Sequence, residues 1–422
     1  MLESLFARFP SFGAAGVGVY KPGLERMAQM CSRMGNPQEK LPLCIHVAGT
    51  NGKGSTCNMI AAHLAASGRR TLLYTSPHIL DYRERIRVIE KGAEDCVSTL
   101  ISREEVWDFI NRYREDFDIL DLSLFEITTA MMLEFAVSRK VDAAVIETGL
   151  GGRLDATNVI TPSLSVITNI GYDHMDLLGQ TLPDIAAEKA GIIKPGVPVV
   201  IGESSPETDP VFERVAASCG APIHFADRQG PGGLPDAIAS PAEGLDLKGI
   251  YQAKNLNTVC CALRTLGMEP DMRAIASAAA ICDFHGRWEK ICGDPYTICD
   301  IGHNEHGLKY NFRQLDTLLD SGAFTDLVMV YGSVSDKDVD AVLRILPRRA
   351  VIFFTAAANR RAMPADELFR RAAHQGGTVV DGVANAVSQA IDLCRTMARP
   401  LLYIGGSTYI VSEALPIFTE RK

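Results

Sequence analysis

The sequence predicts an α/β protein of two domains, each built on a mainly parallel sheet that helices cover. From residue 43 onward, apolar β-rich segments alternate with helical patterns over short connections, which is typical of parallel sheets. At 422 residues the chain is also longer than one ordinary core allows. The alternation restarts after residues 285–287, so we expect one domain over residues 1–287 and a smaller one over 288–422.

The expected elements follow from these runs in order. In the first domain, strands are expected at 43–48, 71–75, 143–147, 164–169 and 197–201. Helices are expected there at 54–67, 104–116, 125–139 and 182–190. In the second domain, strands are expected at 297–301, 327–331, 350–354, 378–380 and 401–404, with helices between them that include 338–345 and 384–395. The Gly- and Pro-rich stretch 227–241 predicts an irregular excursion.

Composition narrows the class of protein. The net charge of −9 argues against binding to nucleic acid, and no apolar run approaches the ~18 residues of a membrane helix. Glu3 and Arg8 interrupt the first ten residues, so no secretory signal is expected. The eleven cysteines lack close C-x-x-C pairs, which favours reduced thiols in a cytoplasmic protein without zinc. A monomer is expected.

A Gly-rich turn over residues 46–56 is the most informative motif. It joins an apolar strand to a helix, where backbone N–H groups and the helix dipole favour an anion. Lys53 adds a charge for the outer phosphates, and Ser55 or Thr56 offers a hydroxyl for Mg²⁺. Val47 stands where the common pattern has Gly, and Gly54 is inserted after the lysine; the alternative is a turn that only joins two elements. The predicted fold is a P-loop, parallel-sheet ATPase domain followed by a smaller Rossmann-like α/β domain.

Polar side chains follow further strands of the first domain. Glu147 ends an apolar strand and suits Mg²⁺, or is only an acid that caps a loop, and the glycines after it indicate close approach of a ligand to the backbone. His174 follows the next strand and is expected to reach the same cation, although a single histidine is often structural. Lys189, near a helix end, is either a site residue or a solvated lysine.

Amide and loop residues extend the pattern. Gln252 and Asn255 share a helix face and match the edge of a purine, or are ordinary polar residues at a helix start. In the second domain, polar loops follow the strands that end near residues 300, 331 and 404, which predicts one functional edge.

Together these motifs resemble the folylpolyglutamate synthase/dihydrofolate synthase family of the Mur ligase superfamily. The matching segments run in the family's order along nearly the whole chain: HVAGTNGKGS (46–55), TSPHILDYRERI (75–86), LFEITTAMML (124–133), ETGLGGRLDATN (147–158), ITNIGYDH (167–174), EKAGIIKPG (188–196), YQAKN (251–255), HGRWE (285–289), DIGHN (300–304), YGSVSDKD (331–338) and GGSTY (405–409).

The resemblance implies ATP- and Mg²⁺-dependent formation of an amide. A carboxylate of dihydropteroate or a folate would attack the γ-phosphate of ATP, and the amine of L-glutamate would then displace phosphate from the acyl phosphate. It further implies two Mg²⁺ sites and carbamylation of Lys189. Small molecules are the partners implied, and both synthase activities are expected in one chain.

The resemblance also assigns residues by motif position. The ATP-binding residues implied are Thr50, Asn51, Gly52, Lys53, Gly54, Ser55, Asn255, Arg287 and Asp300. The catalytic residues implied are Lys53, Lys189, Asp300 and His303. The metal ligands implied are Ser55 with Glu147 for the first ion, and Ser76, Glu147 and His174 for the second. The substrate-binding residues implied are Ser76, Pro77, His78, Phe125, Glu126 and Ser407.

Two departures and two rival functions remain at this stage. Glu305 stands where the family usually has Pro, and Gly302 where Ala is common, a change expected to be sterically mild. The first rival is another Mur-type ligase that acts on a different carboxylate acceptor. The second is a nucleotide-binding module without amide chemistry, which has no need of the loops of the second domain.

Overall fold

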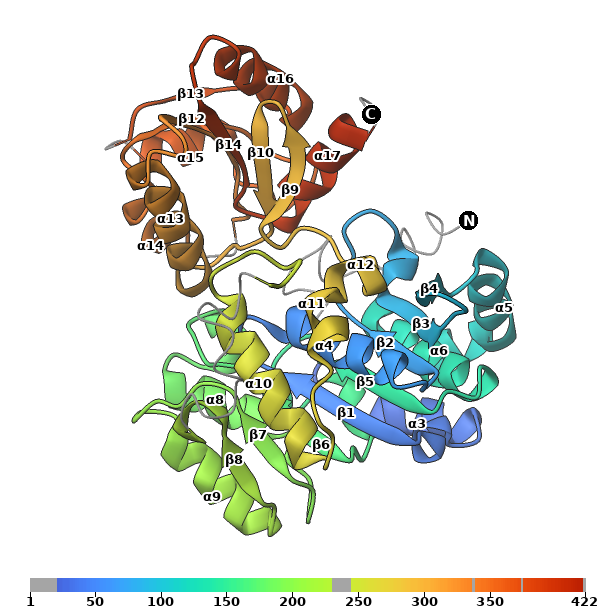
Figure 1. Ribbon diagram of the computed structural model, residues 1–422. Coiled ribbons are helices and arrows are strands. Elements are labelled where there is room, and N and C mark those ends of the chain that lie inside the picture. Colours follow the sequence, from blue (N-terminus) through green and yellow to red (C-terminus); the bar gives the residue numbers. More distant parts are fainter. Residues whose placement is uncertain (1–20, 230–243, 336–337, 373–374, 420–422) are drawn as a thin grey trace. The chain divides into compact units, whose positions relative to one another are not determined.

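A computed structural model describes residues 21–229, 244–335, 338–372 and 375–419, and Figure 1 shows how its elements run. The chain divides into two compact units. Unit 1 comprises the chain as far as Asp246 together with Gln252–Phe284, and unit 2 comprises Leu247–Tyr251 and the chain from His285 onward. Residues 1–20 and most of the expected 227–241 excursion lie outside the described residues.

Unit 1 contains an eight-stranded sheet with the order β4-β3-β2-β5-β1-β6-β7-β8. Its strands are β1 (Leu43–Ala48), β2 (Thr71–Tyr74), β3 (Ile86–Lys91), β4 (Cys96–Leu100), β5 (Ala143–Glu147), β6 (Leu164–Ile167), β7 (Val199–Ile201) and β8 (Ile223–Phe225). Pairing is parallel from β2 to β8, whereas β3 and β4 form an antiparallel extension at one edge. The carboxyl ends of β2, β5, β1 and β6 therefore lie side by side.

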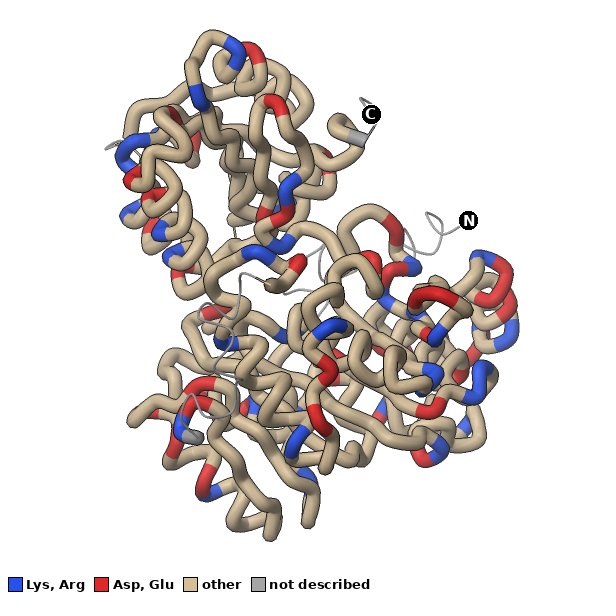
Figure 2. Tube along the Cα trace, viewed as in Figure 1, with Lys and Arg blue, Asp and Glu red and all other residues tan. Residues whose placement is uncertain are grey.

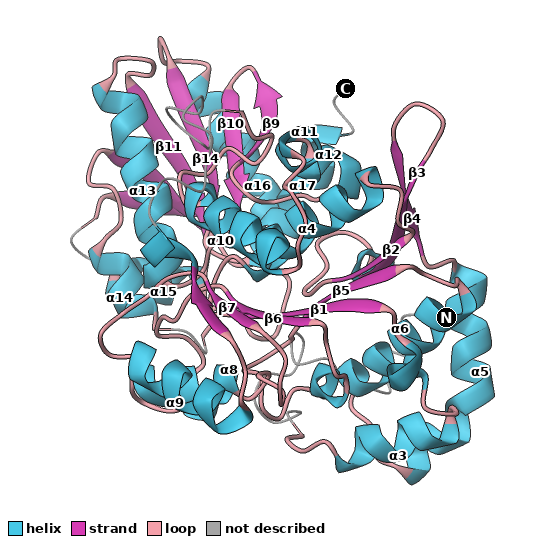
Figure 3. Ribbon diagram, turned by 60° about the horizontal axis from the view of Figure 1, so that its bottom comes forward, coloured by secondary structure: helices cyan, strands magenta, loops and turns pink. Residues whose placement is uncertain are grey.

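Helices cover both faces of this sheet (Figure 3). They are α3 (Glu25–Arg33), α4 (Lys53–Ala66), α5 (Arg103–Ile119), α6 (Leu124–Ser138), α7 (Met175–Leu178), α8 (Leu182–Ala190), α9 (Asp209–Cys219), α10 (Gln252–Thr265), α11 (Met272–Ala276) and α12 (Ala278–Cys282). Helix α4 is buried on all sides from Gly54 to Ala65 because the sheet lies on one side and α10–α12 on the other. Helices α5, α6, α8 and α9 lie on the opposite face of the sheet.

Unit 2 contains a six-stranded sheet with the order β13-β12-β11-β14-β10-β9, parallel except for β9. Its strands are β9 (Glu289–Gly293), β10 (Tyr296–Asp300), β11 (Asp326–Tyr331), β12 (Ala350–Phe354), β13 (Gly377–Val379) and β14 (Pro400–Gly405). Its helices are α13 (Glu305–Asp320), α14 (Val339–Arg344), α15 (Ala365–Arg371), α16 (Val383–Cys394) and α17 (Thr408–Thr419). The last residues of β10, β14 and β11 are neighbours in register, which confirms the predicted polar edge.

Each strand and helix expected from the sequence is present, with ends shifted by a few residues. Strands β3, β4, β8 and β9 were not expected. Strands β4, β8 and β9 lie at the edges of the sheets, and β4 alternates half-buried with exposed residues. Strand β3 lies inside the sheet, but Arg87, Glu90 and Lys91 interrupt its apolar residues, so it lacks the long apolar run that marks a central parallel strand.

Lys and Arg alternate with Asp and Glu along both units (Figure 2). Among the described residues, no helix combines the length and the apolar character that crossing a bilayer requires.

Candidate active site

The Gly-rich turn leaves β1 and enters α4 at Lys53. Gly52 adopts φ +82°, a left-handed conformation that favours glycine, and a Cβ there would lie 2.2 Å from Asn255 Oδ1. The ammonium of Lys53 donates to two carbonyl oxygens of its own loop, Gly49 O at 3.1 Å and Thr50 O at 3.3 Å. The lysine that the sequence assigned to the phosphates is thus folded onto the loop that would hold them.

The loop after β6 fixes the outer side of this turn. Thr168 Oγ1 donates to Asn51 O at 2.6 Å, and the Asn51 amide donates to Asn169 Oδ1 at 3.0 Å. The Thr50 amide donates to Asn169 O at 2.9 Å. A Cβ at position 49 would lie 1.8 Å from Thr168 Oγ1, so Gly49 permits this close approach. The neighbouring order of β1 and β6 places both loops at one edge.

A buried amide contacts the predicted metal ligand Ser55. Gln252 Nε2 donates to Ser55 Oγ at 3.1 Å, and Asn255 Nδ2 donates to Gln252 Oε1 at 2.8 Å. Gln252 is fully buried, and both ends of its amide are used within the protein. Sequence reasoning proposed Gln252 for a purine edge; the structure instead makes it a support for Ser55. The i, i+3 spacing was the available signal, but it did not reveal the partner.

Glu147 ends β5 and is almost completely buried. Its Oε2 accepts the amide of Ser76 at 3.0 Å, which brings the residue after β2 to the same edge. Among the described residues, no three His, Cys, Asp or Glu side chains gather into a metal site. A carboxylate and a hydroxyl are nevertheless the hard oxygen donors that Mg²⁺ takes when phosphates and water supply its other ligands. Glu147 and Ser55 therefore fit a nucleotide-bound magnesium ion rather than an all-protein cage.

His174 lies at the start of α7 and adopts φ +51°. Its ring Nε2 lies 3.8 Å from Asp173 Oδ1, and its amide donates to that same carboxylate at 2.9 Å. Its expected role as a ligand of a second cation stays a prediction.

Lys189 lies in the last turn of α8 and is 3% exposed. Its ammonium donates to Gly49 O at 2.9 Å, so the same carbonyl accepts from Lys53 and Lys189. This burial and the contact with the Gly-rich turn over residues 46–56 (the P-loop) exclude the alternative that Lys189 is a solvent-exposed helical lysine.

The glycines after Glu147 have neighbours within the protein. A Cβ at Gly149 would lie 2.4 Å from the Phe125 ring, and one at Gly152 would lie 2.8 Å from the carbonyl oxygens of Glu188 and Lys189. Close approach of a ligand to these glycines stays a prediction; in this structure Gly149 admits a phenyl ring and Gly152 the end of α8. Gly152 allows the loop to pack against the turn that carries Lys189.

Residues 75–85, here called the acceptor loop, connect β2 to β3 and include Ser76, Pro77 and His78. The Glu84 carboxylate closes the loop by accepting the amides of Ile79, Leu80 and Asp81 at 2.7–2.8 Å. Arg85 Nε donates to His78 Nδ1 at 2.9 Å. Burial, with Arg85 adding to it, lowers the pKa of His78 to about 3, so this imidazole is neutral at physiological pH.

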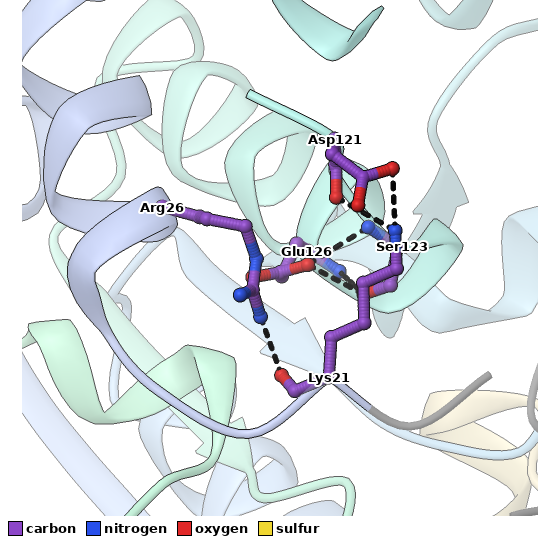
Figure 4. Close-up of polar contacts among 5 residues, drawn as sticks. All are labelled: Lys21, Arg26, Asp121, Ser123 and Glu126. Atoms are coloured by element: carbon purple, nitrogen blue, oxygen red, sulfur yellow. Dashed lines mark hydrogen bonds and ion pairs between the residues drawn. The ribbon is translucent and has the colours of Figure 1, made fainter. Parts of the chain in front are cut away.

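Phe125 and Glu126 begin α6 with different roles. Glu126 Oε2 accepts from the amide and hydroxyl of Ser123 in a capping box, and its Oε1 accepts from Arg26 Nε at 2.9 Å (Figure 4). Both oxygens of this buried carboxylate are thus engaged in holding the start of α6, whereas Phe125 is half-buried against Gly149.

In unit 2, Asp300 ends β10 and collects three donors. Its Oδ2 accepts Tyr251 Oη at 2.7 Å and the Trp288 amide at 2.8 Å, and its Oδ1 accepts the Gly302 amide at 2.7 Å. The bond from Tyr251 explains why residues 247–251 group with unit 2. Sequence reasoning passed over Tyr251, although it opens the YQAKN motif.

His303 and Ser407 lie on neighbouring loops at the same edge of unit 2. His303 Nδ1 lies 3.1 Å from Ile301 O, so this nitrogen carries the proton and donates. Ser407 Oγ is buried and accepts the Ile410 amide at 3.3 Å, while Arg287 Nη1 donates to His285 O and Gly286 O at 3.3 Å.

The two departures from the family pattern have local explanations. Glu305 is the first residue of α13 behind the N-cap Asn304, where an acidic side chain suits the helix dipole. A Cβ at Gly302 would lie 2.9 Å from Asp300 Oδ1 and 3.2 Å from Asn311 Nδ2. An alanine here would require the side chains of Asp300 and Asn311 to shift, whereas the glycine of this chain fits the space as it is.

Two family models match the sequence: the Mur ligase middle domain over residues 122–216 and the Mur ligase glutamate ligase domain over residues 286–404. The dihydrofolate synthase/folylpolyglutamate synthase of Bacillus subtilis is 34% identical over 83% of this chain and 84% of that protein. The Escherichia coli protein of the same name is 31% identical over 95% of this chain and 92% of its own length. By contrast, the chain spans 49% of the probable bifunctional folylpolyglutamate synthase/dihydropteroate synthase of Haloferax volcanii, at 30% identity.

Solved structures with a similar fold carry the same family names as these relatives. E. coli FolC in complex with DHPP and ADP gives a TM-score of 0.82 at 28% identity, covering 95% of this chain and 94% of that one. The Mycobacterium tuberculosis folylpolyglutamate synthase complexed with ADP and AMPPCP gives 0.83 at 29% identity, covering 99% and 97%.

Proposed function

The chain belongs to the folylpolyglutamate synthase/dihydrofolate synthase family of the Mur ligases, and we propose that it joins L-glutamate to dihydropteroate and to reduced folates with hydrolysis of ATP. The acceptor carboxylate attacks the γ-phosphorus, ADP leaves, and an acyl phosphate forms. The glutamate amine then attacks the acyl carbon, loses a proton and expels inorganic phosphate. The relatives named for both synthase activities support one chain with both.

The observation that carries this proposal is the convergence of loops at one edge of the unit 1 sheet. The P-loop follows β1, the acceptor loop follows β2, and Glu147 ends β5 between them. The hydrogen bond from the Ser76 amide to Glu147 joins the acceptor loop to the end of β5. A nucleotide phosphate and a carboxylate acceptor held at this edge would meet, which is the positioning that acyl phosphate formation needs.

Each group then has a role. Backbone amides of residues 52–55 and the Lys53 ammonium hold the phosphates, Thr50 and Asn51 hold the turn through their bonds to Asn169, and Asn255 lies beside the adenine. Ser55 and Glu147, with Ser76 and His174 for a second ion, would hold Mg²⁺, which neutralises developing charge on the transferred phosphoryl group. From unit 2 we propose that Arg287 and Asp300 bind ATP, and that His303 and Ser407 act on the γ-phosphate and the incoming glutamate.

A product assay tests the proposal. Purified protein is incubated with ATP, Mg²⁺ and L-glutamate, with dihydropteroate or tetrahydrofolate in parallel reactions, and products are identified by mass. We expect a glutamate adduct in both reactions and ADP in equal amount. Phosphate release with muramyl acceptors but not with pteroates would instead identify another Mur-type ligase, and ATP turnover without any adduct would identify a nucleotide-binding module.

We further propose a monomer in the cytoplasm. All eleven cysteines are unpaired thiols in the structure, and most are buried, which suits a reducing compartment.

A further inference from the structure

Arg87 is a buried charge that the roles above do not use. It lies in β3 between Ile86 and Val88, which point into the core beneath α5 and α6, so its own side chain points to the opposite face, where α4 and α12 pack. The residue is 3% exposed. Burial lowers the pKa of its guanidinium, although nearby Asp283 and Glu84 oppose this. A buried guanidinium is costly to maintain unless its donors are well used.

The guanidinium donates to two segments that are far apart in the sequence. Nε and Nη2 both donate to Glu84 O, at 3.2 and 3.0 Å. Nη1 donates to Cys282 O and to Asp283 O, the latter at 3.1 Å. All of these acceptors are backbone carbonyl oxygens, and within the described part of the chain Arg87 forms no ion pair.

Each segment is itself well anchored. Glu84 lies at the end of the acceptor loop, and its carboxylate holds three amides of that loop. On the other side, Cys282 is the last residue of α12 and its thiol donates to Asn58 O of α4. Helix α4 begins at the P-loop. Arg87 therefore connects the acceptor loop to α12 and, through α12, to α4, which begins at the P-loop.

We propose that Arg87 is a positioning residue for the acceptor substrate, because its planar fork fixes the acceptor loop against the end of α12. The inference rests on the proposed function, since the loop is assigned to the acceptor there. Loss of the fork loosens the end of the loop at Glu84, while the bond of the Ser76 amide to Glu147 and that of Tyr82 to Thr128 remain. The effect then falls on binding of the acceptor rather than of ATP, whose loop is held by separate bonds to residues 168–169 and 189.

The first experiment compares R87M with R70M in steady-state assays. Arg70 is a matched control, because it also binds β3, through Glu90 at 2.7 Å, but is half exposed and lies away from the acceptor loop. For R87M we expect KM for dihydropteroate to rise about tenfold with less than a twofold change in KM for ATP, and R70M to match the wild type. An unchanged KM for dihydropteroate, or an equal rise in both KM values, overturns the proposal.

If R87M does not fold, the variant R87K tests the proposal in its place. It keeps the charge but lacks the planar fork, so KM for dihydropteroate should still rise, by about threefold, with KM for ATP unchanged. A wild-type KM for dihydropteroate in R87K overturns the proposal.

A second readout is independent of activity. Hydrogen–deuterium exchange of the amides in residues 75–85 should be about tenfold faster in the Arg87 variant than in wild type or R70M, while residues 49–55 exchange as before. Unchanged exchange in residues 75–85 would show that Arg87 does not hold the acceptor loop. If the wild type forms no adduct with any pteroate, the proposed function fails. Faster exchange in the Arg87 variant would then still show that Arg87 holds this loop.

Discussion

Gln252 holds Ser55 through a single hydrogen bond in a fully buried place. The same amide accepts from Asn255, so the residue assigned to adenine and the residue assigned to Mg²⁺ are joined through one side chain. Groups that orient a metal ligand commonly change metal affinity by about 10- to 100-fold when they are removed. We therefore propose that Gln252 orients Ser55 as a metal ligand.

The variant Gln252→Leu should raise the Mg²⁺ concentration for half-maximal ligase activity by about tenfold, because Ser55 Oγ loses the donor that orients it. A magnesium titration of adduct formation measures this. The control is Gln375→Leu, which removes a buried amide that donates to Leu346 O in unit 2 and should leave the titration midpoint in place. Equal midpoints for both variants would remove Gln252 from the site.

Lys189 supplies the second residue-scale prediction. Its ammonium contacts Gly49 O of the P-loop, and a carbamate at Nζ would keep one N–H while adding two oxygens that share one negative charge beside this loop. Lys189→Ala should lower turnover by about a hundredfold, and short-chain carboxylates should restore part of it. Lys194→Ala is the control, since Lys194 follows on the same segment and donates to Asn158 O. Full activity of Lys189→Ala would exclude Lys189 from the site.

Among the elements, helix α8 depends on the glycine loop that packs against its end. A Cβ at position 152 would lie 2.8 Å from two backbone oxygens of that helix turn. Gly152→Ala should cost about 1–3 kcal/mol in the free energy of unfolding, because backbone atoms on both sides must move. Urea denaturation measures this, with Gly244→Ala as control because no described atom lies within 4 Å of a Cβ there. Similar free energies of unfolding for both variants would show that the last turn of α8 accommodates the added methyl group without loss of stability.

The start of helix α6 is held by an ion pair in addition to its capping box. Glu126 is buried and accepts from Arg26, whereas the neighbouring pair of Lys21 with Asp121 leaves the carboxylate 83% exposed (Figure 4). Arg26→Met should therefore cost about 1–3 kcal/mol of unfolding free energy by leaving a buried charge, and Lys21→Met less than about 1 kcal/mol. Urea denaturation of the two variants checks the order, and a larger loss in Lys21→Met would contradict it.

For the molecule as a whole, two histidines with strongly lowered pKa values contribute to the response to acid. Burial lowers the pKa of both His46 and His78 to about 3, so the unfolded chain takes up their protons first as the pH falls below 6.5. Their stabilising effect is fully present above pH 6.5 and is lost progressively toward pH 3. Between pH 7.5 and 5.5 the free energy of unfolding should fall by up to about 3 kcal/mol for the two groups.

Urea unfolding at these two pH values tests the prediction. The variant His46→Gln should show a loss smaller than that of the wild type by about half of this amount, because residue 46 then no longer takes up a proton on unfolding, whereas His78 still does. Identical losses in the wild type and the variant would contradict the assignment to His46.

The sequence supported some features of the fold and the site better than others. Long apolar runs predicted β1, β5 and β11 well, because a central parallel strand is buried on both faces. The edge hairpin of β3 and β4 carries no such run, and Arg87 within it gave no local sign of burial. The types of the site residues were readable, since phosphates and Mg²⁺ demand amides, cations and oxygen donors, but their partners were not.

By itself the sequence determined that this is a two-unit α/β ligase with a P-loop, an acid at a strand end and a family-specific order of motifs. Local chemistry fixes these, since a turn, a strand or a ligand type depends on residues close together in the chain. The tertiary structure alone decided that Lys53 and Lys189 share one carbonyl, that Gln252 supports Ser55, and that Arg87 connects the acceptor loop to α12. These pairings join residues up to 197 positions apart, and sequence spacing carries no record of which distant groups a packed core brings together.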